Sequence, residues 1–503
     1  MEKTLRIFFT SDIHGHIYPT DYHSPEEKDL GLFKCVNQFR KDGNTLIIDG
    51  GDLLQGSPLG AFQHDSVGNA RPFAEIMNAC GYDYVTLGNH DFNFGMEYLN
   101  SYLSSLQARC VCQNLLGSQG DPDFPWQLHV LENGLRIGIV GIVTDHVNVW
   151  ERPEHLTNHS IVDPFPAVKA ALEEMKPQVD LTVCVYHGGF ERELETDRVL
   201  TASTENIGCR ICQELDFDLL LTGHQHMHVP GQYFKNTFIV QPVENGREFH
   251  RIDVQVRDGR KTITSQSLKP AGRCIPELLD RFQPMNQGAQ QWLDTVVGHL
   301  ARPLVPGDHL QMAAQGSDLV NFFHQVQLDV TGAQISVASL ANEAAGMPEV
   351  VHRRDVLTAY PYTNTLTVLE VPGRLLRQAM ERTAQYFTLE QGKPQISDTF
   401  LKPKVEHYNY DYYWGVHYTL DLRRPLGRRV TDLTYQGKPA ADDDLFTVCL
   451  NSYRASGAGG YPGYPQCKVL REINVEMSDL ILEFFRRHPA AQVSSQSYMT
   501  LLY

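Results

Sequence analysis

The sequence predicts an α/β fold in two domains: an N-terminal α/β sandwich of mixed sheets flanked by helices, joined by a linker helix to a smaller C-terminal α/β domain. At 503 residues with 42% hydrophobic content, the chain is long and apolar enough to build at least two cores. Short β-rich apolar runs alternate with helical patterns through the first half, which is typical of α/β proteins. From about Gly272 this alternation stops, and a second α/β pattern begins past Pro303.

The apolar runs are the predicted strands of the first domain. They are Leu5–Phe9, Thr45–Ile48, Tyr84–Leu87, Ile137–Val143, Leu181–Tyr186 and Leu219–Leu221. Between them, helices are predicted around Pro72–Asn78 and over Pro166–Met175, where apolar residues recur at helical spacing.

The change of pattern near Gly272 marks the predicted domain boundary. Residues 275–282 and 287–300 predict amphipathic helix with no strand between them. We therefore expect a first domain over residues 1–272, a linker helix over 273–302 and a second domain over 303–503. In the second domain we expect helices near 318–326 and 477–486, and strands near 366–371 and 416–422.

Charge and composition exclude several functions. The chain has 60 acidic and 43 basic residues and a formal charge of -17, which disfavours binding to the phosphate backbone of nucleic-acid polymers. No apolar stretch reaches the roughly 20 residues that span a bilayer, and the N-terminus has no signal-peptide pattern, so we expect a cytoplasmic protein without a membrane partner. The ten cysteines are expected to be reduced, and the pair Cys209 and Cys212 is expected to lie on an ordinary helix.

Polar residues follow the predicted strands, where open α/β sheets place their ligand sites. Taken singly, each is best explained as a turn, a cap or a partly buried histidine. Together they offer carboxylate, imidazole and amide oxygen ligands in a number that suits two divalent metal ions bridged by a carboxylate. Asp12 and His14, two residues apart, would point the same way in extended backbone. The candidate ligands are Asp12, His14, Asp52, Asn89, His187, His224 and His226.

This ordered set of motifs resembles the calcineurin-like metallophosphoesterases. The resemblance implies one metal ion held by Asp12, His14, Asp52 and His226, and a second held by Asp52, Asn89, His187 and His224, with Asp52 bridging. It also implies that His90 acts on the phosphate, by stabilising the transition state or by protonating the leaving oxygen. The ligand types are compatible with manganese, zinc, iron or cobalt.

Three segments of the second half resemble the C-terminal domain of the 5′-nucleotidases and 2′,3′-cyclic-nucleotide phosphodiesterases. They are Pro361–Asn364, Tyr408–Asp411 and Asn451–Pro462. The resemblance implies that Tyr362 and Tyr453 sandwich a nucleobase and that Asn364 hydrogen-bonds its edge, in a loop that contains Gly457 and Gly459. Ordinary core packing is the alternative for these tyrosines, because the chain has 22 of them.

Three departures from the 5′-nucleotidase pattern favour the branch that acts on cyclic or broad-range nucleotides. Asn93 stands where the classical 5′-nucleotidases have an aspartate that orients the catalytic histidine. The stretch 340–345 lacks the arginines that hold substrate phosphate, and Glu343 lies within it. Gly459 replaces an aspartate of the base-binding loop.

The sequence therefore predicts an enzyme that hydrolyses phosphate esters of small nucleotides with two divalent metal ions. A 5′-nucleotidase and a 2′,3′-cyclic-nucleotide 2′-phosphodiesterase with 3′-nucleotidase activity are the leading forms. A nucleotide-sugar pyrophosphatase is a further possibility with the same metal centre. A non-catalytic nucleotide-binding protein is disfavoured because all seven ligands are present, and the oligomeric state stays open.

Overall fold

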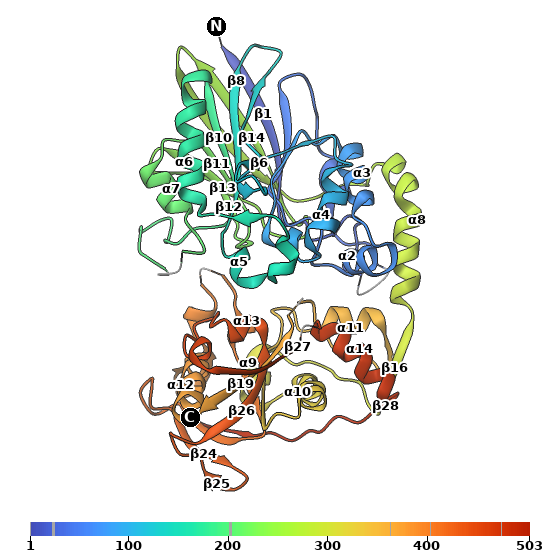
Figure 1. Ribbon diagram of the computed structural model, residues 1–503, viewed down its shortest axis with the longest axis vertical. Helices are drawn as coiled ribbons and strands as arrows, with labels where there is room; N and C mark the ends of the chain where they lie inside the picture. Colours follow the sequence, from blue (N-terminus) through green and yellow to red (C-terminus); the bar gives the residue numbers. More distant parts are fainter. Residues whose placement is uncertain (1, 23–25, 201–203, 363, 403, 474) are drawn as a thin grey trace. The chain divides into compact units, whose positions relative to one another are not determined.

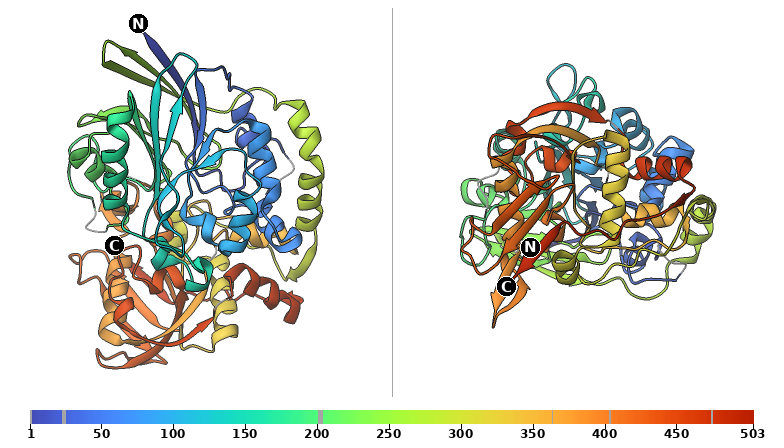
Figure 2. Two further views of the ribbon diagram at one scale, coloured as in Figure 1. Left: turned by 45° about the horizontal axis from the view of Figure 1, so that its top comes forward. Right: turned by 90° about the horizontal axis from the view of Figure 1, so that it is seen from below.

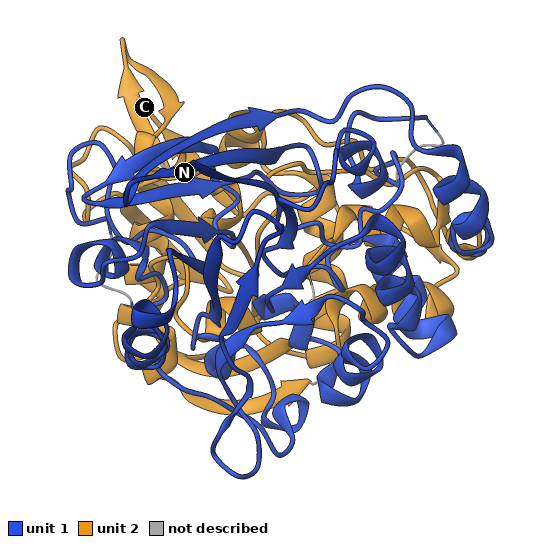
Figure 3. Cartoon of the chain, turned by 90° about the horizontal axis from the view of Figure 1, so that it is seen from above, with its two compact units in different colours: residues 1–290 blue, residues 291–503 orange. Residues whose placement is uncertain are grey.

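The computed structural model describes residues 2–22, 26–200, 204–362, 364–402, 404–473 and 475–503. The chain divides into two compact units, residues 1–290 and 291–503, coloured blue and orange in Figure 3. The division falls within helix α8 (Pro276–Leu293), the long yellow-green helix of Figure 2.

Unit 1 contains two six-stranded mixed sheets. In the first, with order β15-β14-β1-β2-β3-β4, strands β1 to β4 run parallel and β14 and β15 complete an antiparallel edge. Its strands are β1 (Lys3–Thr10), β2 (Thr45–Asp49), β3 (Tyr84–Val85), β4 (Arg109–Cys110), β14 (Phe249–Arg257) and β15 (Arg260–Leu268).

The second sheet has the order β12-β13-β11-β10-β8-β7, in which β13, β11, β10 and β8 run parallel and both edges are antiparallel. Its strands are β7 (Gln127–Val130), β8 (Arg136–Val143), β10 (Leu181–His187), β11 (Leu219–Thr222), β12 (Val229–Phe234) and β13 (Thr237–Gln241). A small third sheet is formed by β5 (Cys112–Leu116), β6 (Pro122–Phe124) and β9 (Ser160–Ile161).

The core of unit 1 lies in layers on both faces of the second sheet. Val183 and Val185 of β10 join an apolar cluster with Ile7 of β1, so this cluster fills the space between the two sheets. Cys184 and Tyr186 of the same strand point the other way, into a cluster with helices α6 (Pro164–Met175) and α7 (Gly208–Glu214), which cover the outer face in Figure 1. Because both faces are covered, the strand is buried at every position, which agrees with its predominantly apolar sequence.

Shorter helices connect the strands of unit 1. They are α1 (Leu32–Val36), α2 (Pro58–Phe62), α3 (Arg71–Cys80), α4 (Gly95–Leu103) and α5 (Val147–Trp150), with the single-turn segments η1 (Gln63–Val67), η2 (Asn89–Phe92), η3 (Pro153–Leu156) and η4 (Lys176–Gln178). The six predicted strands and the two predicted helices of this unit are all present.

The predicted linker helix over residues 273–302 is wrong in its second part. Helix α8 ends at Leu293, and Val296–Leu300 form strand β16. This strand pairs with β18 (Val350–His352) and β28 (Ala490–Ala491), so distant segments supply its hydrogen bonds. The β-branched pair Val296 and Val297 favours an extended backbone.

Unit 2 is built on a five-stranded sheet of order β22-β17-β26-β19-β27. These strands are β17 (Ile335–Ala338), β19 (Leu366–Pro372), β22 (Tyr412–Trp414), β26 (Leu445–Asn451) and β27 (Lys468–Ile473). A second sheet contains β23 (His417–Asp421), β24 (Val430–Tyr435), β25 (Lys438–Pro439) and β29 (Met499–Leu502), and a hairpin contains β20 (Phe387–Glu390) and β21 (Lys393–Ile396).

The helices of unit 2 pack with these strands around one apolar core. They are α9 (His309–Gln315), α10 (Asp318–Thr331), α11 (Arg353–Ala359), α12 (Gly373–Ala384), α13 (Ser452–Ala455) and α14 (Met477–Arg487), with turns η5 (Asp398–Phe400), η6 (His407–Asn409) and η7 (Tyr464–Gln466). The strands predicted near 366–371 and 416–422 and the helices predicted near 318–326 and 477–486 are present.

Two composition-based expectations can be compared with the structure. All ten cysteines are free thiols, and Cys209 and Cys212 lie on helix α7 as expected. None of the helices in the described part of the chain is both long and apolar enough to cross a bilayer.

Candidate metal centre

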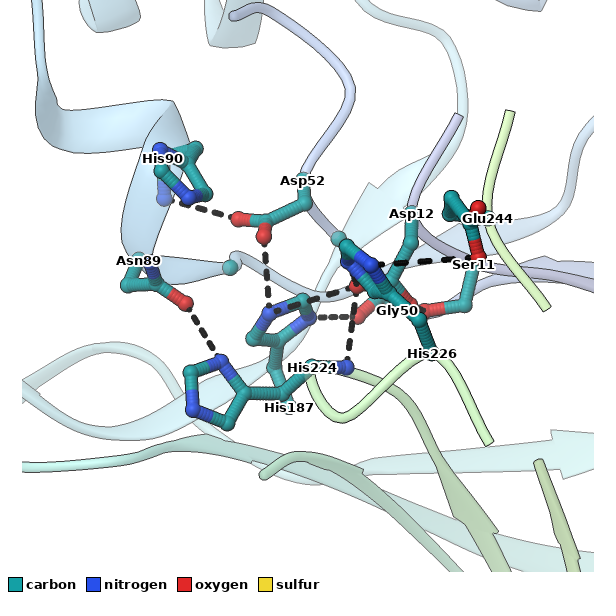
Figure 4. A network of polar contacts seen from close by, with 12 residues as sticks. Ser11, Asp12, Gly50, Asp52, Asn89, His90, His187, His224, His226 and Glu244 are labelled. Carbon is teal, nitrogen blue, oxygen red and sulfur yellow. Dashed lines mark hydrogen bonds and ion pairs between the residues drawn. The ribbon is translucent and has the colours of Figure 1, made fainter. Parts of the chain in front are cut away.

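The five polar clusters predicted from the sequence meet in unit 1, at the carboxyl ends of its parallel strands (Figure 4). Asp12 and His14 follow β1, Asp52 follows β2, and Asn89 follows β3. From the second sheet, His187 is the last residue of β10, and His224 and His226 follow β11. The two sheets thus bring their ligands to one point, because parallel strands end at the same edge of a sheet.

Asp12, His14 and His226 form the first group that could hold a metal ion. The Nε2 atoms of His14 and His226 lie 3.1 Å apart, and His226 Nε2 lies 3.4 Å from Asp12 Oδ1. His14 donates its Nδ1 hydrogen to the carbonyl of Gln55 at 2.8 Å, and His226 Nδ1 faces Glu244 at 3.8 Å. With Nδ1 engaged outward, the two imidazoles direct Nε2 at a common point, as metal-ligating histidines do.

Asp12, Asp52 and His187 form the second group. His187 Nε2 lies 3.1 Å from Asp52 Oδ2 and 3.9 Å from Asp12 Oδ1, while its Nδ1 donates to the carbonyl of Gly50 at 2.7 Å. Asp12 therefore belongs to both groups. Asp52 Oδ2 also lies 3.8 Å from His14 Nε2, so this carboxylate reaches toward both groups as well. The bridging role of Asp52 stays a prediction.

Asn89 and His224 contact each other beside these groups. Asn89 Oδ1 and His224 Nδ1 are 2.8 Å apart, and the imidazole of His224 lies 5.6 Å from that of His187 between ring centres. The backbone N–H of His224 donates to Asp12 Oδ1 at 2.9 Å, and its Nε2 contacts Glu205 at 2.9 Å. All seven predicted ligands thus belong to one connected network.

Most of the ligands sit on left-handed backbone, which contradicts one step of the sequence reasoning. The prediction that Asp12 and His14 point the same way because their backbone is extended is wrong. Their φ angles are 55° and 52°, in the left-handed region. Asp52, His224 and His226 also have positive φ, between 55° and 70°. Such conformations are uncommon for residues other than glycine and cluster at functional sites, where surrounding structure holds them.

The side chain of Asp91 connects the loop after β2, which contains Asp52, with the loop after β3. Its carboxylate accepts hydrogen bonds from the backbone N–H groups of Asp52, Leu53, Leu54 and Gly88, at 2.9–3.0 Å. The loops after β2 and β3 are therefore held by a single buried side chain. His90 adds a backbone bond from the other side, because its N–H donates to Asp52 Oδ1 at 2.7 Å.

The centre fits a divalent cation. Asp52 Oδ2 and His187 Nε2 are buried and make no hydrogen bond within the described residues, although they face each other. Burial disfavours the charged imidazole of His187, but the adjacent Asp52 carboxylate outweighs this effect and raises the pKa of His187 to about 10. Two buried carboxylates thus require positive charge beside them, which metal ions would supply on displacing the His187 proton.

His90 lies at the rim of this network with its Nδ1 bound to Asn93. His90 Nδ1 and Asn93 Oδ1 are 2.7 Å apart, and the imidazole of His90 lies 5.3 Å from that of His14 between ring centres. Asn93, which stands at the position of the orienting aspartate, therefore contacts His90 directly.

In unit 2, three tyrosines gather where a base-binding site is predicted. Tyr408 lies 6.3 Å from Tyr362 and 6.4 Å from Tyr453 between ring centres, and its ring is steeply inclined to both. Asn364 lies next to this group in sequence, whereas Thr363 lies outside the described residues. The role of Tyr362, Tyr453 and Asn364 in substrate binding stays a prediction, and Tyr408 is a third aromatic neighbour.

A buried ion pair underlies the loop that carries Tyr453. Arg454 is 2% exposed and contacts Asp411 Oδ2 at 2.9 Å, and its guanidinium also donates to the carbonyl of Ala458 at 2.6 Å. Gly457 and Gly459 have φ of 89° and 72°. A Cβ at Gly459 would lie 2.1 Å from Asn409 Oδ1 and 2.2 Å from the Arg454 guanidinium, so these two side chains leave room only for glycine at this position.

Sequence reasoning missed the acidic residues that surround the ligands. Glu205 and Glu244 contact His224 and His226, and Glu151 contacts Asn93. Each lies in a loop or turn outside the predicted strands and helices, where no periodicity marks it. Glu343, which the sequence analysis singled out, is exposed. Residues 340–345 contain no arginine that could bind phosphate at the predicted site of unit 2.

Two family matches agree with this architecture. Residues 5–228 match the calcineurin-like phosphoesterases, and residues 296–466 match the 5′-nucleotidase C-terminal domain. A Staphylococcus aureus protein assigned as a 5′-nucleotidase, solved with alpha-ketoglutarate, is 30% identical over the whole of both chains, with a TM-score of 0.92.

Curated relatives point to the same group. The trifunctional nucleotide phosphoesterase protein YfkN of Bacillus subtilis is 24% identical over 95% of this chain, which spans only 38% of that relative. The 2′,3′-cyclic-nucleotide 2′-phosphodiesterase/3′-nucleotidase of Haemophilus influenzae is 24% identical over 91% of this chain and 81% of its own length.

The fold and the site define a phosphoesterase of the calcineurin-like class, whose members depend on divalent metal ions. More narrowly, the chain belongs to the family that joins this catalytic domain to a 5′-nucleotidase C-terminal domain. Relatives named 5′-nucleotidase and 2′,3′-cyclic-nucleotide 2′-phosphodiesterase/3′-nucleotidase are hydrolases.

Proposed function

We propose that this protein hydrolyses phosphate esters of small nucleotides at a centre of two divalent metal ions in unit 1. The observation that carries the proposal is the pair of ligand groups that share Asp12, with two buried ligand atoms left without hydrogen bonds in the described structure. When bound, such ions activate water as a nucleophile and neutralise charge on the phosphoryl oxygens. We assign the seven ligands as predicted from the sequence.

The remaining residues bind and orient the substrate. His90 contacts the phosphate and stabilises its developing charge or donates a proton to the leaving oxygen through Nε2, because Nδ1 is bound to Asn93. Tyr362 and Tyr453 stack on the base, and Asn364 bonds its edge. Gly457 and Gly459 give the loop after Tyr453 the left-handed turns that it needs.

Within the family, we infer that the substrates are 2′,3′-cyclic nucleotides and 3′-nucleotides. Asn93 in place of aspartate, the absence of arginine from residues 340–345 and glycine at 459 support this choice. The names of the cyclic-nucleotide 2′-phosphodiesterase/3′-nucleotidase relatives agree with it. A 5′-nucleotidase is the second candidate, favoured by the Staphylococcus aureus structure and by relatives of that name.

Initial rates on four substrates test these proposals. The purified protein with added Mn²⁺ is given 2′,3′-cyclic AMP, 3′-AMP, AMP and UDP-glucose, and phosphate or nucleotide release is measured. We expect the highest kcat/KM for the first two; preference for AMP would favour the 5′-nucleotidase, and preference for UDP-glucose a nucleotide-sugar pyrophosphatase. Elemental analysis of protein purified without chelator identifies the metals among manganese, zinc, iron and cobalt.

Two variants test whether the measured activity belongs to this protein and not to a contaminating enzyme. Asp52→Ala should lose both metal and activity, whereas His90→Ala should keep its metal and lose most of its turnover. Release of product from none of the four substrates, with two metal ions bound per chain, would contradict the enzymatic proposal and favour a non-catalytic nucleotide-binding protein.

A further inference from the structure

The Glu151 carboxylate lies behind Asn93, on the side away from His90. Glu151 directly follows helix α5, its side chain is 7% exposed, and its Oε1 accepts a hydrogen bond from Asn93 Nδ2. The other oxygen, Oε2, lies 2.7 Å from His155 Nδ1. Glu151 follows strand β8 of the second sheet, whereas Asn93 follows β3 of the first, so this contact joins loops from both sheets.

The chemistry of the three groups fixes the direction of the hydrogen bonds. An ionised carboxylate can only accept, so Glu151 requires the amide of Asn93 to turn its NH₂ toward it. The carbonyl oxygen of Asn93 then faces His90, and because that oxygen can only accept, His90 must carry a hydrogen on Nδ1. Without Glu151, the Asn93 amide could rotate by 180° and present either end to the imidazole.

We propose that Glu151 is a positioning residue for His90 that acts through Asn93. It selects the amide orientation that keeps the hydrogen of His90 on Nδ1 and leaves Nε2 to exchange a proton with substrate. In the classical 5′-nucleotidase pattern, an aspartate places its negative charge directly beside the histidine. In this chain the neutral Asn93 contacts His90, and the carboxylate of Glu151 contacts Asn93 from behind. The inference extends the proposed function, because it assumes that His90 takes part in hydrolysis.

Single substitutions test the effect on turnover. Glu151→Gln keeps the shape but can turn either end of its amide to Asn93, and we expect kcat to fall about tenfold with KM within about twofold of the wild type. Glu151→Ala should lower kcat further. Glu154→Gln removes the same charge from an exposed position three residues away and is the matched control, with unchanged kcat.

Exchange of the charge between the two positions gives a sharper test. Asn93→Asp alone sets two carboxylates against each other and should lower kcat more than tenfold. The double variant Asn93→Asp/Glu151→Gln restores one donor and one carboxylate and should recover to within about threefold of the wild type. A double variant no more active than Asn93→Asp, or a Glu151→Gln enzyme with wild-type kcat, would overturn the proposal.

A spectroscopic readout is independent of the substrate. In protein labelled with ¹⁵N-histidine, the long-range ¹H–¹⁵N spectrum distinguishes the two imidazole tautomers, and the His90→Gln spectrum identifies the His90 signals. We expect the Nδ1–H form in the wild type and a mixture in Glu151→Gln. If the wild type lacks activity on every nucleotide but shows this change, the proposed function fails and the positioning role stands; an unchanged His90 tautomer refutes the positioning role.

Discussion

At the residue scale, the proposed base site rests on Tyr362 and Tyr453, with Tyr408 beside both rings. Stacking on an aromatic face stabilises a nucleobase by roughly 1–3 kcal/mol and tolerates different bases. Tyr408 lies within 6.4 Å of both other rings between ring centres. In the proposed base site, stacking on Tyr362 and Tyr453 would therefore favour nucleosides in general over one particular base.

Removal of one of these rings should act on binding. For Tyr453→Ala we expect KM for the preferred nucleotide to rise about tenfold to a hundredfold, because one stacking face is lost. Hydrolysis of bis(4-nitrophenyl) phosphate, which has no base, should be unchanged. Tyr233→Ala, at a half-exposed ring in unit 1, is the control. Equal losses on both substrates would contradict a base-stacking role.

His324 makes unit 2 sensitive to acid. The side chain is 1% exposed, its Nδ1 lies 2.8 Å from Ser336 Oγ, and burial lowers its pKa to about 3. In the unfolded chain the imidazole takes up a proton near pH 6.5, whereas in the folded unit it stays neutral until about pH 3. Stability is therefore lost as the pH falls from 6.5 toward 3.

We expect this histidine to destabilise unit 2 by about 2 kcal/mol between pH 7 and pH 5. His324→Gln should remove that part of the pH dependence, because an amide does not titrate in this range. Urea unfolding at both pH values, followed by a unit 2 signal, measures the difference. His299→Gln, at an exposed histidine of the same unit, should retain the wild-type pH dependence; the same loss in both variants would refute the assignment.

Which polar residues gather at the candidate centre could be predicted from sequence, because each lies at the end of an apolar strand or just past it. Their backbone could not, since nothing in Asp12 or His14 by itself favours positive φ. The sequence also does not single out Glu151, Glu205 and Glu244. A glutamate in a loop has no pattern that distinguishes it from other loop glutamates, and only the fold shows which of them lie beside the site.

At the scale of elements, the turn between β3 and η2 depends on a glycine for reasons of space. Gly88 has an extended φ of -100°, so backbone strain is no obstacle to other residues there. A Cβ at this position would, however, lie 2.1 Å from Asp52 Oδ1. The turn and the Asp52 side chain therefore fit only when residue 88 has no side chain.

Gly88→Ala should displace the Asp52 carboxylate and lower the affinity for Mn²⁺ while leaving the fold intact. Isothermal titration with Mn²⁺, together with circular dichroism, measures both effects, and we expect at least a tenfold weaker Kd. Gly43→Ala makes a similarly close contact, but with the end of the exposed Glu132 side chain, which can move away. Unchanged Mn²⁺ affinity in Gly88→Ala would contradict this account.

Strand β16 illustrates where element prediction fails. Its five residues follow a genuine helix and carry no alternation of their own, and its partners β18 and β28 come from far along the chain. Strands β1, β2 and β10 were predictable because their apolar character is set by burial on both faces, which is visible locally. Long-range pairing leaves no such local mark.

For the whole molecule, a net charge of -17 coexists with a centre that requires cations. The acidic chain concentrates divalent ions and repels polyanions, while bound metal ions would make the centre itself attractive to phosphate. Metal binding should also stabilise unit 1, because the unfolded chain has no preformed site.

Addition of Mn²⁺ to chelator-treated protein should raise the melting temperature of unit 1 by roughly 5 °C at saturating concentration, without moving the transition of unit 2. Differential scanning calorimetry resolves the two transitions. The variant His226→Gln should show a smaller increase and Asp12→Asn almost none. An equal increase in Asp12→Asn would mean that Mn²⁺ stabilises the chain elsewhere.

The spread of the ligands along the chain has a consequence for how the protein matures in the cell. The backbone N–H of His224 binds Asp12 across 212 residues, and β1, which Asp12 follows, also needs β14 as its antiparallel neighbour. During synthesis, the early ligands therefore leave the ribosome long before their partners exist. Metal acquisition becomes a late event that only a completed unit 1 can perform, so partly made chains stay metal-free and hydrolytically inert.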